Sequence, residues 1–368
     1  MQRLALALAL AGCRAHFDAR PIDASPDAPP LQLACNTPVR LADAQPTSMI
    51  AAVAATYSAT ESEIVAQLVE TTGDMHIAVV RLFGADQAQA DYIPDPRISG
   101  ITAIASASNS AFIVMAFTRN GTSYLQGYDP FPVRPILASP APLPDLLGGP
   151  RAIAFTGTGT EPLAAITTIS AANQISVYGI NDIVQLGSPL VIATAGPVAS
   201  SALVNVGDRI AFVNATTANN CSVGTIDPAV TSNSAAAGWG TANQCTQAQL
   251  GYSPGRDDAL LIRHDLTDGD LNHVIATRTG STYTIPGENR LRNPGNEPRP
   301  VGVSDGYWVG YETSGTFEAA HVDFAHVVGT VATLGPLTTI GTYDVVVANG
   351  EPYAIWVQDG LELAHLCP

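Results

Sequence analysis

Apolar runs of strand length recur along the chain at a nearly constant spacing. Polar turns separate them, which suits short β-strands better than long helices. Seven such runs stand out, at residues 63–70, 111–117, 162–169, 209–215, 259–265, 307–312 and 353–359. Their centres lie about 46 to 52 residues apart, and a period of this length indicates repeated supersecondary units within one domain.

Each run lies inside a unit of four expected strands. A shorter apolar run and a turn precede it, and Asp305-Gly306 and Asn349-Gly350 are hairpin signals between two such runs. Another run follows, and a less regular fourth run closes most units. Four short strands per unit predict a β-propeller, in which blades stack in a ring because none can bury its faces alone. We predict an all-β, seven-bladed propeller over residues 31–368, with six or eight blades as alternatives.

The last unit contains only three strands, because the chain ends at Pro368 as its third strand finishes. A candidate for the missing fourth strand is the N-terminal segment 35–44, which looks like residues 130–139 of the second unit. In an antiparallel pair the end of one strand lies beside the start of the next, where Cys367 and Cys35 stand. We therefore predict a ring closed by an N-terminal strand and by a Cys35–Cys367 disulfide.

The other cysteines fit the same scheme. Cys221 begins the third expected strand of the fourth unit, and Cys245 lies past its fourth-strand region, so the two would face each other. With Cys13 assigned separately below, four of the five cysteines remain, and an even number in an exported chain implies disulfides. We predict a second bridge, Cys221–Cys245.

One unit also resembles a known repeat. Residues 252–280, "YSPGRDDALLIRHDLTDGDLNHVIATRTG", resemble the WD40-like repeats of TolB-type propellers, in which a Ser-Pro-Asp-Gly turn precedes the second strand. Gly255 stands where that pattern has Asp, and the other six units match poorly. The resemblance covers less than a tenth of the chain and implies a propeller.

The N-terminus has the pattern of an export signal. Arg3 precedes the apolar run Leu4–Leu10, and Leu10-Ala11-Gly12-Cys13 resembles the lipobox of bacterial lipoproteins. The resemblance implies a signal peptide at 1–12, a lipid anchor on Cys13, and a chain attached to the bacterial outer membrane, on its periplasmic side or at the cell surface. Residues 13–30, rich in Pro, Asp and Ala, would be a disordered tether.

Charge narrows the possible partners. The net charge is −16 and all sixteen basic residues are Arg, which argues against a surface that follows nucleic-acid phosphates. After Cys13 no segment reaches the about 18 apolar residues of a membrane-spanning helix. We expect a monomeric domain without a cofactor, outside the cytoplasm.

Two polar clusters could hold a metal ion. Asp265, Asp268 and Asp270 could supply oxygens to Ca²⁺, but the spacing departs from an EF-hand loop, and a solvated Asp-Gly turn is the interpretation we favour. His321, Asp323 and His326 could bind Zn²⁺, and here too a cluster at a blade edge is favoured. We assign no metal site.

Two long loops offer binding residues instead. Trp239 lies in a Gly-flanked loop at 231–244, and Arg290 and Arg292 lie in a loop that also contains Arg299. On a propeller the Arg loop and the acidic turn of the fifth unit would be neighbours, and exposed Trp and Arg are common at binding interfaces. We expect a non-catalytic binding or scaffold module for a protein, peptide or glycan. The alternative is a propeller glycoside hydrolase or polysaccharide lyase, whose carboxylate pair linear sequence cannot show.

Overall fold

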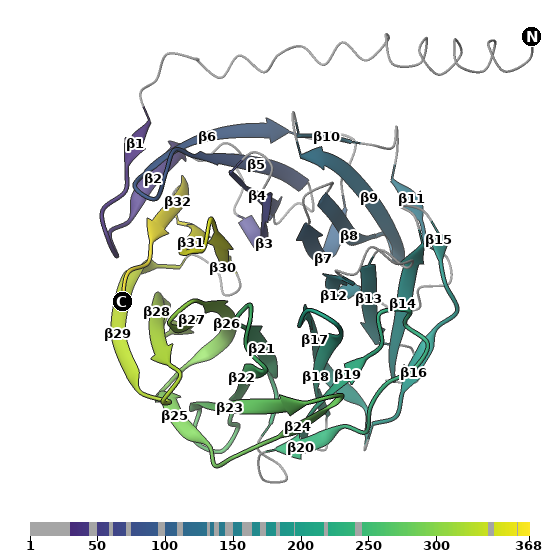
Figure 1. Ribbon diagram of the computed structural model, residues 1–368. Coiled ribbons are helices and arrows are strands. Elements are labelled where there is room, and N and C mark those ends of the chain that lie inside the picture. Colours follow the sequence, from purple (N-terminus) through teal and green to yellow (C-terminus); the bar gives the residue numbers. More distant parts are fainter. Residues whose placement is uncertain are drawn as a thin grey trace, which may run out of the picture.

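Seven small antiparallel sheets lie around a common axis in the computed structural model (Figure 1). The structure describes residues 30–43, 50–58, 62–70, 75–94, 100–108, 113–130, 133–135, 140–143, 150–156, 164–169, 174–181, 185–194, 196–216, 220–239, 245–337, 342–358 and 360–368. The expected signal peptide and almost all of the expected tether lie outside these residues. Among the described residues no helix is long and apolar enough to cross a membrane.

The fold is a seven-bladed β-propeller, as predicted. Blade 1 consists of β3 (Ile50–Ser58), β4 (Glu63–Glu70), β5 (Met75–Leu82), β6 (Gln87–Pro94) and, at its outer edge, β1 (Leu31–Gln32). Blade 2 consists of β7 (Ile101–Ser108), β8 (Ile113–Arg119), β9 (Thr122–Pro130), β10 (Val133–Pro135) and β11 (Ala141–Pro142). Blade 3 consists of β12 (Pro150–Phe155), β13 (Ala164–Ile169), β14 (Ile175–Asn181), β15 (Gln185–Leu186) and β16 (Leu190–Ile192).

The second half of the ring follows the same order from the axis outwards. Blade 4 consists of β17 (Val198–Asn205), β18 (Ile210–Thr216), β19 (Cys221–Ile226) and β20 (Ala237–Trp239). Blade 5 consists of β21 (Gln249–Tyr252), β22 (Asp258–His264), β23 (Leu271–Thr279), β24 (Thr282–Thr284) and β25 (Asn289–Arg292). Blade 6 consists of β26 (Asn296–Val303), β27 (Gly306–Thr313), β28 (Thr316–Asp323) and β29 (Val328–Pro336). Blade 7 consists of β30 (Tyr343–Ala348), β31 (Glu351–Val357), β32 (Gly360–His365) and β2 (Val39–Asp43).

The seven apolar runs form the second strand of each blade. These strands are apolar on both faces because both faces pack against neighbouring blades: β18 and β27 are buried along their whole length. Every hydrophobic cluster of the described residues likewise joins two adjacent blades. The core is therefore a set of seams between blades, and each blade depends on its neighbours for burial.

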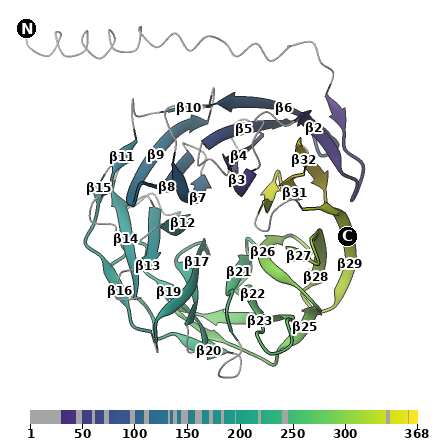
Figure 2. The ribbon, with the colours of Figure 1, turned by 180° about the vertical axis from the view of Figure 1, so that it is seen from behind.

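The N-terminal segment completes the last blade. β2 pairs antiparallel with β32, with Val39 opposite Leu363 and Asp43 opposite Gly360. Both views of the ring place β1 and β2 beside β6 and β32 (Figures 1 and 2). The prediction of a closing N-terminal strand is confirmed. The two-residue strand β1, which adds an outer edge to blade 1, was not predicted.

A disulfide and a reciprocal hydrogen-bond pair fasten this closure. Cys35 is bonded to Cys367 with their Cα atoms 5.4 Å apart. The Asn36 side chain donates to the carbonyl of Cys367 at 2.8 Å and accepts from the Cys367 amide at 3.0 Å. The first and last residues of the described chain thus lie close to this disulfide, and the predicted Cys35–Cys367 bridge is confirmed.

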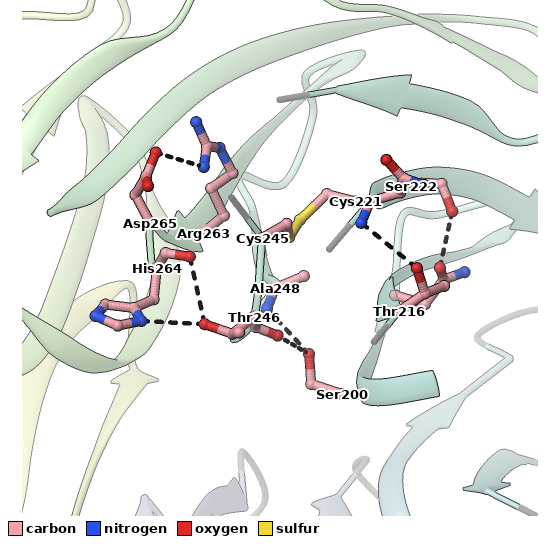
Figure 3. The surroundings of a disulfide bond; sticks show 12 residues. Ser200, Thr216, Cys221, Ser222, Cys245, Thr246, Ala248, Arg263, His264 and Asp265 are labelled. Carbon is pink, nitrogen blue, oxygen red and sulfur yellow. Dashed lines mark hydrogen bonds and ion pairs between the residues drawn. A yellow bond between two sulfur atoms is a disulfide. The ribbon is translucent and has the colours of Figure 1, made fainter. Parts of the chain in front are cut away.

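The second predicted disulfide is also present and joins blade 4 to the segment that leads into blade 5 (Figure 3). Cys221 and Cys245 have their Cα atoms 5.6 Å apart. Beside the bridge, the Ser200 hydroxyl donates to the Thr246 carbonyl at 2.8 Å and accepts from the Ala248 amide at 3.0 Å. The disulfide and the two Ser200 hydrogen bonds together hold the segment that leads into blade 5 against blade 4.

Candidate functional site

The first strands of all seven blades enclose a cavity on the ring axis. Its volume is about 310 Å³, near the lower end of the range of ligand pockets. β3, β7, β12, β17, β21, β26 and β30 each contribute lining residues. We call this cavity the central channel. Its charged and polar lining side chains are Ser106, Arg151, Ser201, Gln249, Arg299 and Asp344.

Asp344 bridges the last and first blades at the channel wall. It lies near the start of β30, and its Oδ2 accepts a hydrogen bond of 2.8 Å from the Ala55 amide on β3. Its Oδ1 accepts one of 2.9 Å from the Val345 amide. Burial raises the pKa of this carboxyl above its usual range, against the opposing influence of the Arg299 guanidinium and the two amides. The ring closure thus has an inner contact as well as the outer disulfide.

The two guanidinium groups differ in how firmly they are held. Arg151 lies where the register of β12 shifts against β13, because Pro150 faces Thr168 and Ala152 faces Thr167. Such a bulge leaves its extra residue unpaired and redirects the side chain. The Arg151 side chain is exposed, and none of the described residues forms an ion pair with it. Arg299 on β26 is partly buried and lies 3.6 Å from Glu297.

The channel wall also contains hydrogen-bonding groups without partners. The innermost strand of each sheet pairs on its outer side only, so its inner edge presents amide and carbonyl groups toward the axis. Among the described residues, the hydroxyls of Ser106 and Ser201 are buried without a hydrogen-bond partner. A buried polar group without a partner is costly. The wall is therefore suited to a polar occupant.

Replacing Asp344 by Asn is expected to change the pH dependence of stability. The pKa of the Asp344 carboxyl is higher in the folded than in the unfolded state. At pH values between these two pKa values, the unfolded state therefore binds fewer protons than the folded state. The wild type should thus lose stability as the pH rises through this interval from about 3.8. The Asp344→Asn variant, which keeps an acceptor for the Ala55 amide, should lack that loss. Thermal melts of both proteins across pH 3 to 8 would measure it, and parallel curves would contradict this assignment.

The acidic turn of blade 5 is a network of ion pairs. Arg263 on β22 is buried and donates to Asp265 at 2.9 Å and to both oxygens of Glu288 at 2.8 and 2.7 Å. Burial pushes the pKa of Asp265 up, but hydrogen bonds from the Thr267 amide and Arg263 outweigh this and hold it below its usual value. Asp265 therefore pairs with an arginine on its own sheet.

Asp268 and Asp270 lie beside Arg290, as predicted, but Arg290 and Arg292 belong to strand β25 and not to a loop. Arg290 on β25 contacts Asp270 through Nε and lies 3.9 Å from Asp268. Burial and the charge of Asp268 raise the pKa of Asp270, and Arg290 opposes this shift. Arg292 pairs with Glu318 of blade 6 at 2.9 Å. Arg290 remains largely exposed, whereas the carboxylates of Asp265 and Asp270 are both engaged by arginines.

Trp239 corrects one sequence expectation. The residue was expected in an exposed loop, but it ends the outer strand β20 opposite Cys221 and is only 6% exposed. Its ring packs with Cys245 and Tyr283 in the cluster between blades 4 and 5. Trp239 thus contributes to a seam between blades and does not offer its ring to a partner. Residues 240–244 of the same loop lie outside the described residues.

The histidine cluster does not converge. His321 on β28 packs against Trp308 and lies 3.5 Å from Asp305. Asp323 instead accepts hydrogen bonds of 2.8 Å from the Ala325 and Val327 amides in the following turn. His326 lies in that turn, 6.1 Å between ring centroids from His273 of blade 5. The three side chains thus contact different partners.

One set of potential metal-binding atoms does lie together, but it belongs to the closure. Within the described part of the chain, Cys35, His365 and Cys367 have side-chain donor atoms within 4.8 Å of one another. Because the two cysteines are bonded to each other, their sulfurs are not thiolate ligands.

The sequence analysis did not single out Arg151 or Asp344 and placed Arg299 in a loop, whereas all three lie on inner strands, and a signal for this was present. Arg151, Arg299 and Asp344 lie at or near the start of the short runs "RAIAF", "RPVGV" and "DVVVA", which precede the apolar cores of their units. A charge at the entrance of an otherwise apolar first strand indicates a position that faces the axis of the ring. The turn Ser253-Pro254-Gly255, in contrast, precedes β22 as expected, with Gly255 at φ +84°.

Comparisons with known proteins bear on the fold alone. No protein-family model matches the chain, and no curated protein matches it. The structure is similar to hydrazine synthase of Kuenenia stuttgartiensis, with a TM-score of 0.58 and 12% identity over 85% of this chain and 95% of that one. SapL1 lectin, solved in complex with alpha methyl fucoside, gives a TM-score of 0.49 and 14% identity over 78% and 97%. At 12% identity the likeness to hydrazine synthase shows the fold alone.

Proposed function

We propose that the chain is a non-catalytic binding or scaffold module that binds a protein, peptide or glycan outside the cytoplasm. The observation that supports this most is the chemistry of the central channel. Its described lining residues include two arginines, Arg151 and Arg299, and one carboxylate, Asp344. Glycoside hydrolysis uses two carboxyl groups about 5 to 9.5 Å apart. Guanidinium, hydroxyl and amide groups around a cavity are suited to holding a polar ligand.

The proposal also includes a location, namely export from the cytoplasm and attachment to the outer membrane. Two disulfides are typical of proteins that mature in an oxidising compartment, which supports export. The anchor on Cys13 rests on the resemblance of Leu10–Cys13 to a lipobox and lies outside the described residues. We propose that acyl chains on Cys13 hold the propeller at the outer membrane, where its channel is open to ligands of the envelope.

The alternative is a glycoside hydrolase or polysaccharide lyase. One observation favours it: Asp344 lies in the channel and has a raised pKa, a property that a general acid needs near neutral pH. Its two oxygens, however, already accept backbone hydrogen bonds from Ala55 and Val345. A second carboxyl group would have to come from a neighbouring segment.

Binding without turnover is the expected result for the full chain carrying Cys13→Ser. Panels of peptides, neutral glycans and acidic glycans would be tested for retention on the immobilised protein, and each retained compound would be analysed by mass spectrometry. We expect at least one class to be retained with its mass unchanged. New reducing ends or unsaturated sugars would overturn the non-catalytic assignment, and retention of no class would overturn the binding function.

A comparison of the native chain with the Cys13→Ser variant tests the lipid anchor. The native chain should partition into detergent and give an acylated Cys13 peptide, whereas the Cys13→Ser variant should remain in the aqueous phase. An unmodified Cys13 in the mature native chain would remove the anchor and leave the binding function to be judged by the panel.

A further inference from the structure

We infer that the central channel binds a single sugar residue bearing a carboxylate, a uronate, and that Arg151 and Arg299 hold this carboxylate. The inference rests on the proposed binding function and names its ligand class. It follows from the charge of the channel, the freedom of its arginines and the neutral polar groups around them.

The charge of the channel is opposite to that of the chain. Acidic residues outnumber arginines by 32 to 16 in the sequence, but two of the three charged residues described in the channel lining are arginines. The lining strands belong to blades on different sides of the ring, β12 in blade 3 and β26 in blade 6 (Figure 1). A cleft with low-dielectric walls strengthens the attraction of such groups for an anion.

Arg151 is the group best placed to receive the anion. Its position in the register shift of β12 frees it from the ladder, and none of the described residues forms an ion pair with it. Arg299 is held more loosely than a bidentate pair, at 3.6 Å from Glu297 and 6.0 Å from the centre of the Tyr343 ring. A guanidinium presents a planar fork of donors that matches a carboxylate.

The remaining wall groups favour a hydroxylated monoanion. Ser201 is 6% exposed and its hydroxyl has no partner among the described residues, and the Gln249 amide lies in the same wall. These groups match the hydroxyls of a sugar, and a volume of about 310 Å³ suits one residue of it. Phosphate carries more negative charge, and Asp344 in the same cavity would repel it. Sugar hydroxyls, in contrast, can donate to a carboxylate.

Calorimetric titration of the full chain carrying Cys13→Ser would test the inference. The probes are glucuronate and galacturonate, with glucose and galactose as neutral counterparts and inorganic phosphate as a second anion. We expect the uronates to bind at least 10-fold more tightly than the neutral sugars and phosphate. Arg151→Ala and Arg299→Ala should each weaken uronate binding by about 10- to 100-fold, as expected for loss of a charge-assisted hydrogen bond.

Arg209→Ala is the matched control, because Arg209 lies in the turn between β17 and β18 and is not a lining residue. It should leave uronate binding unchanged. Melting curves establish that each variant is folded, and if Arg299→Ala does not fold, Arg151→Ala decides, since that exposed side chain has no ion-pair partner among the described residues.

Three outcomes would overturn the inference: no uronate binding, uronate binding unaffected by loss of Arg151, or tighter binding of phosphate than of the uronates. Its failure can be told apart from failure of the binding function. If the Arg151→Ala and Arg299→Ala variants retain a peptide or neutral glycan as well as the wild type does, the module binds elsewhere and only the channel site is lost.

Discussion

Removing the Cys35–Cys367 disulfide is expected to lower the free energy of unfolding by up to about 6 kcal/mol, the figure of the chain-entropy argument. The bond closes a loop with a sequence separation of 332 residues, so its loss returns to the unfolded chain the entropy of closing that loop. The double variant Cys35→Ala/Cys367→Ala should show this loss in urea unfolding followed by tryptophan fluorescence. Neither cysteine is fully buried, so little packing is lost with the sulfurs.

The Cys221–Cys245 bridge provides the comparison. It closes a separation of only 24 residues, for which the same chain-entropy argument gives about 3.5 kcal/mol. Because both of its cysteines are buried, loss of packing adds to that figure in Cys221→Ala/Cys245→Ala. If removal of Cys35–Cys367 changed the unfolding free energy by less than about 1 kcal/mol, the β2–β32 pairing would be sufficient to hold the ring closed.

Replacement of Arg263 by Met is the second large effect, with an expected loss of about 3 to 5 kcal/mol. The guanidinium is 3% exposed and pairs with Asp265, which is 6% exposed, and with Glu288. A methionine of similar length leaves Asp265 and Glu288 without their common cation inside blade 5. Because the cost comes from uncompensated carboxylates, adding Asp265→Asn and Glu288→Gln to the variant should recover part of it.

Arg256→Met is the matched control for this prediction. Arg256 also pairs with a carboxylate, Asp258, at 2.7 Å, but its side chain is 43% exposed. It further stacks over the ring of Phe324, so the expected loss is about 1 kcal/mol. Equal unfolding midpoints for the two variants would mean that burial does not set the cost of breaking the Arg263 network.

The architecture was predictable because the physics of a blade is local in sequence. The second strand of each blade is buried on both faces, which demands an unbroken apolar run, and the fixed size of a blade imposes the period. The run at 63–70 is β4 itself, and 307–312 lies within β27. The closing strand followed from a count of strands, since a ring of four-stranded blades cannot end on three.

The site was less predictable because it depends on which strands meet at the axis. Arg151, Arg299 and Asp344 are far apart in sequence and belong to three blades, and only the closed ring brings them to one cavity. Trp239 illustrates the opposite error. Its glycine neighbours indicated a loop, yet the need to cover the Cys221–Cys245 bridge draws the ring into the seam between blades 4 and 5. The prediction that the acidic turn lies next to the segment with Arg290 and Arg292 was correct, because β23 and β25 are adjacent strands of blade 5.

The position of Cys35 determines how a mechanical load would travel through the propeller. A pull on the chain ahead of Leu31 first peels the two residues of β1 from β6. The tension then reaches Cys35, four residues before β2 begins, and passes through sulfur to Cys367 at the opposite terminus. The hydrogen bonds of β2 to β32 are thereby shielded from unzipping. A propeller pulled at its N-terminus would bear the load on a covalent bond.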